Sequence, residues 1–306
     1  MIYDLYHDES TVAGYWHGML LVPDATRDLL LGELNNVRRN LNHDEPINLK
    51  GLNKRSGKQY RSVQAWLTIC VCALVQKLKG DTCPYTTGKI TRDSSGMRRV
   101  EYLTLRKKIG AKFILFRVRD GHASLYDSMD YAARVETTLR MGLKGGMHLL
   151  GTTEEPIHIR SFHFDGHEHL GRHVDLSRIV DRITGLREYC SFAKPLLLDD
   201  RGSDHRKNDS QALDDCQLLQ LTDLIVGAFR TLLGQCTNDI QKDVSSPISK
   251  LLDSWGRGYA GMSYSRWFRG FCVSQCYLEN EEWQFKDIEN KKDVPAEPTL
   301  FDDIVH

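Results

Sequence analysis

The sequence has few of the features that mark membrane-spanning or secreted proteins. Among its 306 residues, the best apolar run lies around Trp66–Val75, is interrupted by Thr68, and falls short of the roughly 18 residues that a membrane span needs. The first residues, Met1–Asp8, contain neither the basic region nor the apolar core of a secretory signal. We therefore expect a cytoplasmic protein without a membrane partner.

Paired cysteines are also missing, although the chain contains 8 cysteines. Without a C-x-x-C pair, neither a zinc ribbon nor a thioredoxin-like site is indicated, and reduced, mostly buried thiols are expected. Hydrophobic residues make up 41% and charged residues 27%, which excludes a low-complexity or collagen-like chain. A chain of this length can bury a substantial core.

A net charge is missing as well, because 41 basic residues balance 41 acidic ones. The charges are nevertheless unevenly distributed. Ten Lys and Arg lie between Lys89 and Arg119 against two acids, the stretch Lys50–Arg61 has no acid, and acidic residues gather between Glu279 and Asp303. This asymmetry suggests either a surface for a polyanion or a set of solvated helix faces. Overall neutrality argues only against indiscriminate binding of polyanions.

Apolar periodicity predicts an α/β fold. Strands are expected at Met1–Asp8, Gly14–Val22, Lys112–Val118, Ile157–Asp165 and Pro195–Leu198, and helices at Ala25–Leu41, Tyr60–Leu78, Ser128–Leu143, Asp175–Tyr189 and Asp214–Leu233. We expect Asp24 to cap the first helix, and Gly145-Gly146 to end the third. A hairpin followed by alternating strands and helices predicts a mixed sheet with helices packed on it.

Three acidic residues stand where chemistry is often located. Asp8 ends the first strand, Asp165 ends the fourth, and Asp223 lies in a strongly apolar helix on one stripe with Gln220 and Gly227. Carboxylates that converge from strand ends and a helix suit Mg²⁺ or Mn²⁺ and the phosphoryl chemistry of such ions. The alternative for Asp223 is a structural carboxylate that caps a neighbouring loop.

The segments around these acids resemble one known family. Tyr6-His-Asp8-Glu9-Ser10 is similar to the Y-x-D-E-S-G opening of the domain-of-unknown-function family 3800, and Gln220-Leu-Thr-Asp223-Leu-Ile-Val-Gly227 to its late Q-L-A-D-L-I-A-G helix. Phe164-Asp165 resembles its middle aspartate. The order and spacing of the three segments match over about residues 1–235.

The resemblance implies an RNase H-like fold and a metal-dependent nuclease that acts on DNA or RNA, in a defence or mobile-element system. Carried over to this chain, it makes Asp8, Asp165 and Asp223 the ligands of one or two Mg²⁺ or Mn²⁺ ions. Glu9 becomes a candidate fourth ligand, with Gln220 in a supporting position. We also expect His167, or else His163, near the metals as a proton shuttle or substrate contact.

Basic residues of the two positive stretches are expected to contact the nucleic-acid backbone. The candidates are Lys50, Lys54, Arg55, Arg98, Arg99, Lys107 and Lys108. The chain differs from the family at Thr11, where the family has glycine, and at Asn48-Leu-Lys50, which lacks the acid of an E-x-K pattern. This second departure favours an alternative function, a catalytically inactive nucleic-acid-binding or scaffold subunit.

The histidine-rich segment around Asp165 leaves open a third function, a zinc hydrolase that uses His163 to His173. For the organisation of the chain we expect a nuclease domain over residues 1–235, with a basic insertion at about 82–110. A C-terminal helical extension over 236–286 and a flexible acidic tail over 287–306 should follow. A partner protein or a homo-oligomer is expected to regulate the activity.

Overall fold

The computed structural model describes most of the chain. The described residues are 1–10, 15–74, 90–92, 98–100, 109–118, 130–150, 156–164, 175–182, 190–199, 210–234, 236–249, 252, 270–279 and 282–287. The strands are β1 (Ile2–Ser10), β2 (Tyr15–Pro23), β3 (Ile90–Arg92), β4 (Arg98–Val100), β5 (Lys112–Val118), β6 (Ile157–Phe164), β7 (Cys190–Asp199), β8 (Phe271–Glu279) and β9 (Glu282–Asp287). The helices are η1 (Asp24–Thr26), α1 (Arg27–Leu41), α2 (Lys58–Leu74), α5 (Tyr131–Leu150), α6 (Leu176–Arg182), α7 (Ser210–Leu233) and α8 (Asp239–Val244).

A mixed sheet of seven strands, in the order β7-β6-β1-β2-β5-β8-β9, forms the centre of the fold. The antiparallel pairs are β1–β2, β2–β5 and β8–β9, and the parallel pairs are β1–β6, β6–β7 and β5–β8. Strands β3 and β4 form a separate hairpin. The predicted α/β fold with a mixed sheet that begins with an antiparallel hairpin is therefore confirmed.

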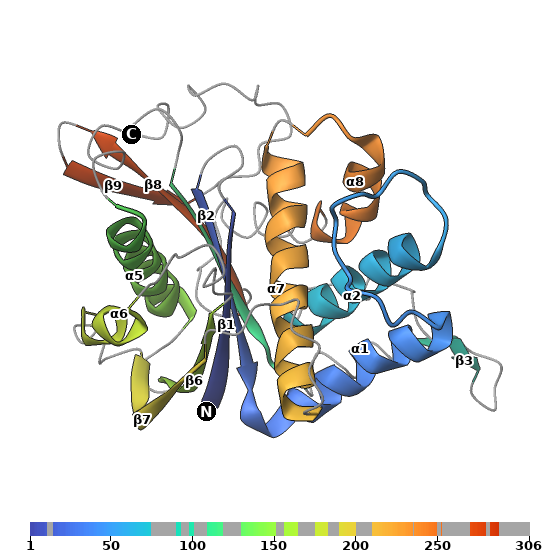
Figure 1. Cartoon of the computed structure of the whole chain (residues 1–306), viewed down its shortest axis with the longest axis horizontal. Coiled ribbons are helices and arrows are strands. Elements are labelled where there is room, and N and C mark those ends of the chain that lie inside the picture. The colour runs from blue at the N-terminus through green and yellow to red at the C-terminus, as the bar shows by residue number, and fades with distance from the viewer. Residues whose placement is uncertain are drawn as a thin grey trace.

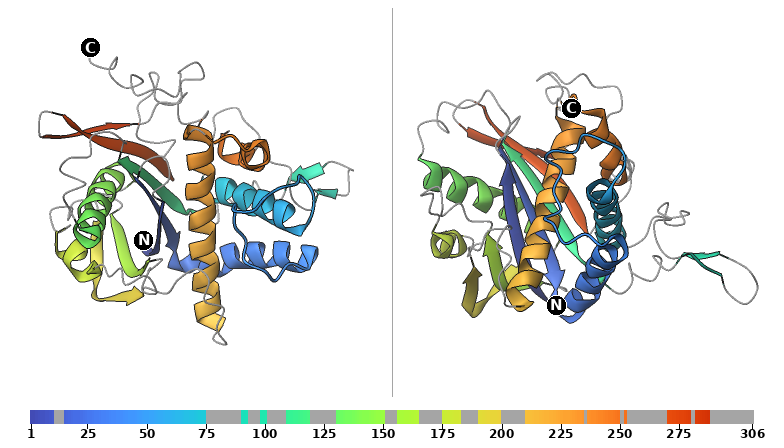
Figure 2. Two further views of the ribbon diagram at one scale, coloured as in Figure 1. Left: turned by 45° about the horizontal axis from the view of Figure 1, so that its top comes forward. Right: turned by 45° about the vertical axis from the view of Figure 1, so that its right-hand side comes forward.

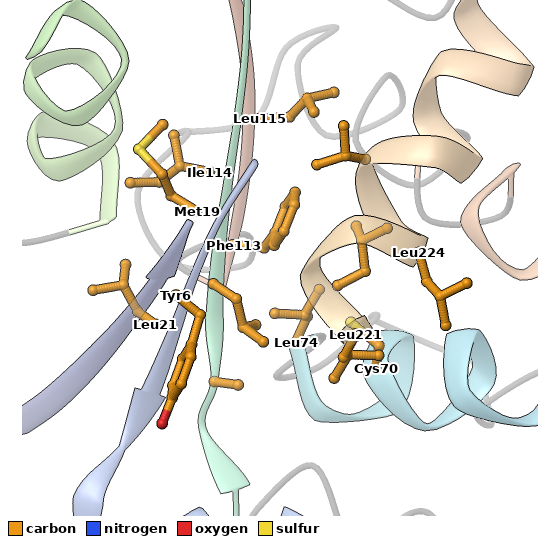
Figure 3. Packing of buried hydrophobic residues seen from close by; sticks show 14 of the residues in the cluster. Tyr6, Met19, Leu21, Cys70, Leu74, Phe113, Ile114, Leu115, Leu221 and Leu224 are labelled. Carbon is orange, nitrogen blue, oxygen red and sulfur yellow. The ribbon is translucent and has the colours of Figure 1, made fainter. Parts of the chain in front are cut away.

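Helices cover both faces of this sheet (Figure 1). Helices α5 and α6 lie on one face, whereas α7 lies on the other and separates the sheet from α1, α2 and α8. Strand β5 is apolar on both sides because each side is covered: Phe113 stacks near Phe229 of α7, while Phe116 lies against Gly142 of α5. Figure 3 shows Leu221 and Leu224 of α7 in the core between the sheet and α2.

Helix α7 has 24 residues and is largely buried. Its segment Leu213–Leu233 is long and apolar enough to cross a membrane, although the sequence patterns predicted no such segment. Within the fold, 72% of its most apolar window is buried, and the helix packs against β1, β2 and α2. Its apolar composition is thus explained by its place in the core.

The glycine pair Gly145-Gly146 and Asp24 do not have the roles at helix ends that the sequence predicts. Helix α5 continues through Gly145-Gly146 to Leu150. A Cβ atom at Gly146 would lie only 2.3 Å from Ile114 of β5. That glycine permits close packing of helix and sheet and is not a helix end. Asp24 does not cap α1, since the position before that helix is Thr26 and the Asp24 carboxylate instead pairs with Arg160 at 2.7 Å.

The C-terminal region also departs from the prediction of a helical extension. It contains α8, but β8 and β9 follow, and β8 pairs in parallel with β5 as part of the main sheet. Residues 271–276 of β8 are buried without interruption, as expected for a strand that lies inside a sheet covered on both faces. The expected tail lies outside the described residues beyond Asp287, as does most of the basic insertion.

The described cysteines are free thiols, and all except Cys236 are buried. Burial raises the pKa of Cys70 above its usual value, and the pKa of Cys190 and of Cys276 to about 12. Thiols of this kind are packing residues with little reactivity. The prediction of reduced, mostly buried cysteines is confirmed for the described residues.

Candidate functional site

Asp8 lies near the C-terminal end of the central strand β1, on the face covered by α7. Its carboxylate side chain is nearly buried, with 5% exposure, and its partner on β2 is Gly18. A Cβ atom at Gly18 would lie 2.1 Å from Val226 and 3.6 Å from Thr222 of α7. Because residue 18 is glycine, the turn of α7 that carries Asp223 can approach the sheet beside Asp8.

The side of α7 on which Asp223 projects can be derived from Arg230. Seven residues make almost two helical turns, so Asp223 and Arg230 point in nearly the same direction. The Arg230 Nη1 atom donates a hydrogen bond of 2.8 Å to Ser10 Oγ, at the end of β1. Asp223 thus lies on the β1 side of α7. Its side chain is half-buried, within a helix that is otherwise buried around it.

The third predicted ligand, Asp165, lies outside the described residues, as does His167. The register between β1 and β6 ends with His7 opposite Phe164, so Asp8 follows the last paired position of β1. In the sequence, Asp165 is the residue after Phe164. In the described part of the chain, no three His, Cys, Asp or Glu side chains form a metal-binding group.

The structure does not bring Glu9 together with Asp8. Successive residues of a strand point to opposite faces, so Glu9 projects toward the side of α5. There its carboxylate accepts a short hydrogen bond from the Tyr15 hydroxyl. The motif placed the two acids side by side in the sequence, but the alternation of the strand separates them.

Behind Asp8, on the α5 face, a buried chain of polar groups links three residues. His7 Nε2 and His17 Nδ1 are 2.8 Å apart, and His17 Nε2 is 2.6 Å from Thr138 Oγ1. Because the Thr138 hydroxyl donates a hydrogen bond to the Arg134 carbonyl, its oxygen accepts a hydrogen bond from His17 Nε2–H. Burial lowers the pKa of His17 to about 3, so this imidazole is neutral at physiological pH.

Gln220 anchors α7 instead of facing the acids. Its Oε1 atom accepts hydrogen bonds from Arg38 Nη2 at 2.9 Å and from the Ile47 amide at 3.2 Å. These bonds tie α7 to α1 and to the loop that follows α1. Gln220 therefore supports the position of α7, and through it that of Asp223.

The same loop carries part of the predicted basic surface. Leu49 packs against Gly227 of α7, where a Cβ atom would lie 2.7 Å from the leucine side chain. Lys50 and Lys54 are exposed in this loop. Arg55 is exposed as well and pairs with Asp243 at 3.2 Å. The loop thus presents positive charge beside the helix that bears Asp223.

The second predicted basic surface is separate from the first. Arg98 and Arg99 belong to β4, where they pair with Arg92 and Thr91 of β3. In both figures that show the whole chain, the β3 strand lies at the periphery, beyond α1 and α2 as seen from the main sheet (Figures 1 and 2). Lys107 and Lys108 lie outside the described residues.

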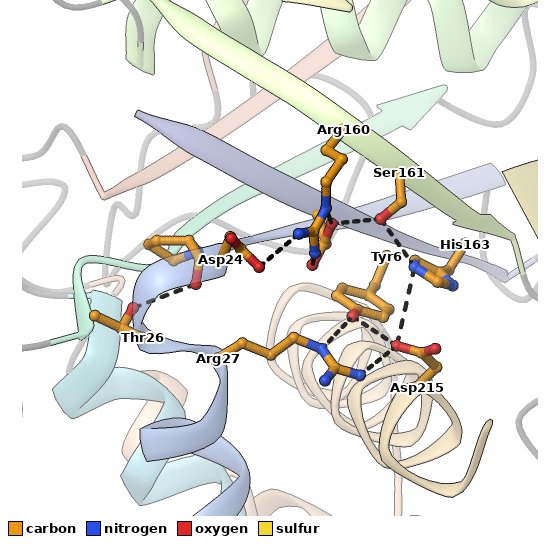
Figure 4. A network of polar contacts seen from close by, with 10 residues as sticks. Tyr6, Asp24, Thr26, Arg27, Arg160, Ser161, His163 and Asp215 are labelled. Carbon is orange, nitrogen blue, oxygen red and sulfur yellow. Dashed lines mark hydrogen bonds and ion pairs between the residues drawn. The ribbon is translucent and has the colours of Figure 1, made fainter. Parts of the chain in front are cut away.

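At the opposite end of β1, a polar cluster surrounds Asp4 (Figure 4). Arg160 donates two hydrogen bonds to the Asp4 carboxylate, at 3.1 and 2.7 Å, and Ser161 Oγ donates a third at 2.5 Å. Asp4 is buried, with 1% exposure. Such a carboxylate is satisfied by fixed partners from the protein itself.

A second polar group adjoins this cluster and centres on Asp215 of α7. Its Oδ1 atom accepts hydrogen bonds from the Tyr6 hydroxyl at 2.9 Å and from Arg27 Nη2 at 2.7 Å. The His163 ring stacks on Tyr6 with 4.6 Å between centroids, and its Nε2 atom bonds to Ser161 Oγ at 3.0 Å. Burial, and then the charge of Asp215, raise the pKa of Tyr6.

Sequence reasoning missed this cluster because its members lie far apart in the chain. His163, expected near the metals, belongs to it instead.

No family model matches the chain, and no curated protein or solved structure matches it.

Proposed function

We propose that this protein is a metal-dependent nuclease with an RNase H-like fold. The observation that carries the proposal is the position of Asp8 on the central strand, beside both the end of β6 and the part of α7 that bears Asp223. Acidic residues from two strand ends and the late helix are the set that the sequence motifs predict for divalent-metal phosphoryl chemistry.

The strand order supports the fold assignment. The five strands β5-β2-β1-β6-β7 are, in chain order, 3-2-1-4-5, with the second antiparallel to its neighbours. This order agrees with the RNase H-like fold that the resemblance implies. Helices α5, α6 and α7 then follow the third, fourth and fifth strands, with α7 on the opposite face from the other two.

The donor set fits Mg²⁺ or Mn²⁺. Asp8 and Asp223 offer carboxylate oxygens, and Asp165 follows β6 in the sequence. Hard divalent ions prefer such oxygen ligands and keep several waters, so two or three carboxylates suffice. When bound, an ion of this kind lowers the pKa of water and stabilises negative charge on the phosphoryl oxygens. The chain's part is to hold the ion beside β1.

The basic groups of the α1–α2 loop are suited to position the substrate. Lys50 and Lys54 are exposed next to α7, and cationic side chains of this kind hold nucleic-acid backbones without reading sequence. The neutral total charge favours a nuclease whose encounter with DNA or RNA is guided by a partner protein or by self-association.

The proposal predicts that cleavage of DNA or RNA depends on a divalent ion and on the acids at the end of β1. Asp8→Asn and Asp223→Asn should each lower cleavage in Mg²⁺ or Mn²⁺ by about 100-fold or more, because even residues behind metal ligands contribute about 10- to 100-fold. Labelled single- and double-stranded DNA and RNA, incubated with and without EDTA, provide the measurement.

Asp239→Asn is the matched control, since Asp239 is exposed on α8 and should leave cleavage unchanged. Unaltered cleavage by folded Asp8→Asn protein would refute the proposal. Salt-sensitive binding without turnover in either metal would instead favour the catalytically inactive binding subunit. Stoichiometric zinc in the purified protein would favour the zinc hydrolase.

A further inference from the structure

One row of side chains crosses the sheet immediately beyond Asp8. Its members are partners on successive neighbouring strands: Ser10 of β1, Trp16 of β2, Arg117 of β5 and Gln275 of β8. The row faces α7. Four residues earlier on their strands, Phe113 and Phe271 point to the same side, where both stack near Phe229 of α7.

Two guanidinium groups lie over adjacent positions of this row. The Cζ atom of Arg117 is 4.6 Å from the centre of the Trp16 ring, and Arg230 of α7 donates its hydrogen bond of 2.8 Å to Ser10. Both arginines are half-buried. The four residues of the row include no acid. One guanidinium from β5 and one from α7 thus lie over the neighbouring strands β2 and β1, and two positive charges in a partly desolvated place favour a bound anion.

Gln275 supplies an independent observation that points to a ligand. It has no exposed surface, yet within the described part of the chain neither its Nε2 nor its Oε1 atom has a hydrogen-bond partner. A buried amide without partners disfavours folding, so such groups in native proteins call for an explanation. An oxyanion bound beside Arg117 would accept a hydrogen bond from this amide.

The row is placed to receive the next part of a strand held at Asp8. Ser10 is two residues beyond Asp8, which is about 7 Å along β1. On α7, Arg230 follows Asp223 by almost two turns on the same side of the helix. It is therefore displaced from Asp223 as Ser10 is displaced from Asp8. A nucleic-acid strand that passes Asp8 and Asp223 would therefore meet both arginines.

We propose that Arg117, Arg230 and Gln275 form a binding subsite for a backbone phosphate of a nucleic-acid strand, next to the phosphate at Asp8. The inference rests on the proposed function, since a nuclease must hold the strand on at least one side of the cleaved bond. The planar guanidinium fork matches phosphate oxygens in geometry and charge, and the amide adds a neutral donor.

Binding without metal tests the subsite separately from cleavage. The full chain is titrated, in EDTA and over a range of salt, with a short fluorescein-labelled single strand of DNA and of RNA. Arg117→Gln and Arg230→Gln should each weaken binding about tenfold, the effect of one charged hydrogen bond. Each should also reduce the slope of log affinity against log salt by about 1.

Three further variants separate binding from structure. Arg39→Gln, on the exposed face of α1, is the matched control and should keep both affinity and slope. Arg117→Lys and Arg230→Lys retain the charge and should recover part of the affinity if a glutamine variant folds poorly. Gln275→Met should weaken binding without lowering the free energy of unfolding, because it removes a buried amide that the protein does not satisfy.

The outcomes distinguish this inference from the proposed function. If folded Arg117→Gln and Arg230→Gln bind like the wild type, or if the wild type binds neither strand, the subsite is refuted. If binding depends on the arginines but no strand is cleaved in Mg²⁺ or Mn²⁺, the subsite stands and the nuclease proposal fails. A Gln275→Met protein that loses stability and keeps its affinity would assign Gln275 a purely structural role and remove it from the subsite.

Discussion

The two ends of β1 present buried acids to α7 in different surroundings. At the N-terminal end, Asp4 is 1% exposed and is held by Arg160 and Ser161. At the C-terminal end, Asp8 is 5% exposed, opposite a glycine, and the next row brings two arginines over the sheet. Burial of an acid is therefore not enough to mark a site. What distinguishes Asp8 is its position near the C-terminal end of β1, because ligands usually bind at this edge of the sheet in α/β folds.

Helix α7 repeats the comparison along its own length. Asp215 is 4% exposed and fixed by Tyr6 and Arg27, whereas Asp223 is half-buried on the side that faces β1. Because both acids belong to one helix, substitutions at the two positions test the difference in a common setting. Asp215 should stabilise the fold, and Asp223 should take part in the proposed chemistry.

The largest effect on stability is expected at Asp215. The variant Asp215→Asn removes the counter-charge of a buried ion pair in which the side chains of Arg27 and Asp215 are 14% and 6% exposed. Breaking such a pair leaves a buried charge behind and costs about 3–5 kcal/mol. The free energy of unfolding, measured by urea denaturation at neutral pH, should fall by about that amount.

Asp223→Asn on the same helix is the control and should change the free energy of unfolding by less than about 1 kcal/mol. Equal losses at the two positions would mean that the two acids are both structural. In that case the contrast between the two ends of β1 would disappear.

The sequence was sufficient for the parts of this comparison that depend on local patterns. The predicted strands at Met1–Asp8 and Gly14–Val22 correspond to β1 and β2, and the predicted apolar helix with Asp223 corresponds to α7. Period-two alternation would have placed Glu9 away from Asp8 had it been applied to the motif. The resemblance made both Asp8 and Glu9 candidate ligands because they are adjacent in the sequence. Adjacent residues of a strand, however, point to opposite faces of the sheet.

The Asp4 and Asp215 clusters could not be predicted because their bonds join distant parts of the chain. Asp4 and Arg160 are 156 residues apart, and Arg27 and Asp215 are 188 apart. No local pattern indicates such a pair. Gly145-Gly146 shows a related difficulty: a glycine pair that ends a helix and one that lets a helix approach a sheet look alike in sequence, and only the position of Ile114 distinguishes them.

Gly18 of β2 lies opposite Asp8, at the C-terminal end of β1, and tests how closely α7 must approach there. In Gly18→Ala, the new methyl group would lie 2.1 Å from Val226 and 3.1 Å from Phe113. Overpacking of this kind costs about 1–3 kcal/mol, and the free energy of unfolding should fall accordingly. Thermal and urea denaturation provide the measurement.

Gly32→Ala on α1 is the opposite case, because a Cβ atom there meets nothing within 4 Å. It should raise the free energy of unfolding by about 0.5–1 kcal/mol, the difference between glycine and alanine inside a helix. If Gly18→Ala were as well tolerated as Gly32→Ala, α7 would not be held tightly over Asp8, and the site would lose its support.

The last effect depends on pH and comes from the reverse face of the same strands, where His17 is buried behind Asp8. Its pKa is about 3 in the folded protein and about 6.5 when unfolded. Between these values the unfolded chain binds more protons, so acidification lowers stability by up to about 1.4 kcal/mol per pH unit. A second proton would also have to enter on Nδ1, which faces His7 Nε2 at 2.8 Å.

The free energy of unfolding, measured by urea between about pH 6 and pH 4, should therefore fall less steeply for His17→Gln than for the wild type. Other acid-sensitive groups are common to both proteins and cancel in the difference. Equal slopes would mean that His17 takes up a proton without unfolding. The polar cluster around Asp4 would then mark the more rigid end of β1. Strands β1 and β2 would accommodate a charged His17 behind Asp8.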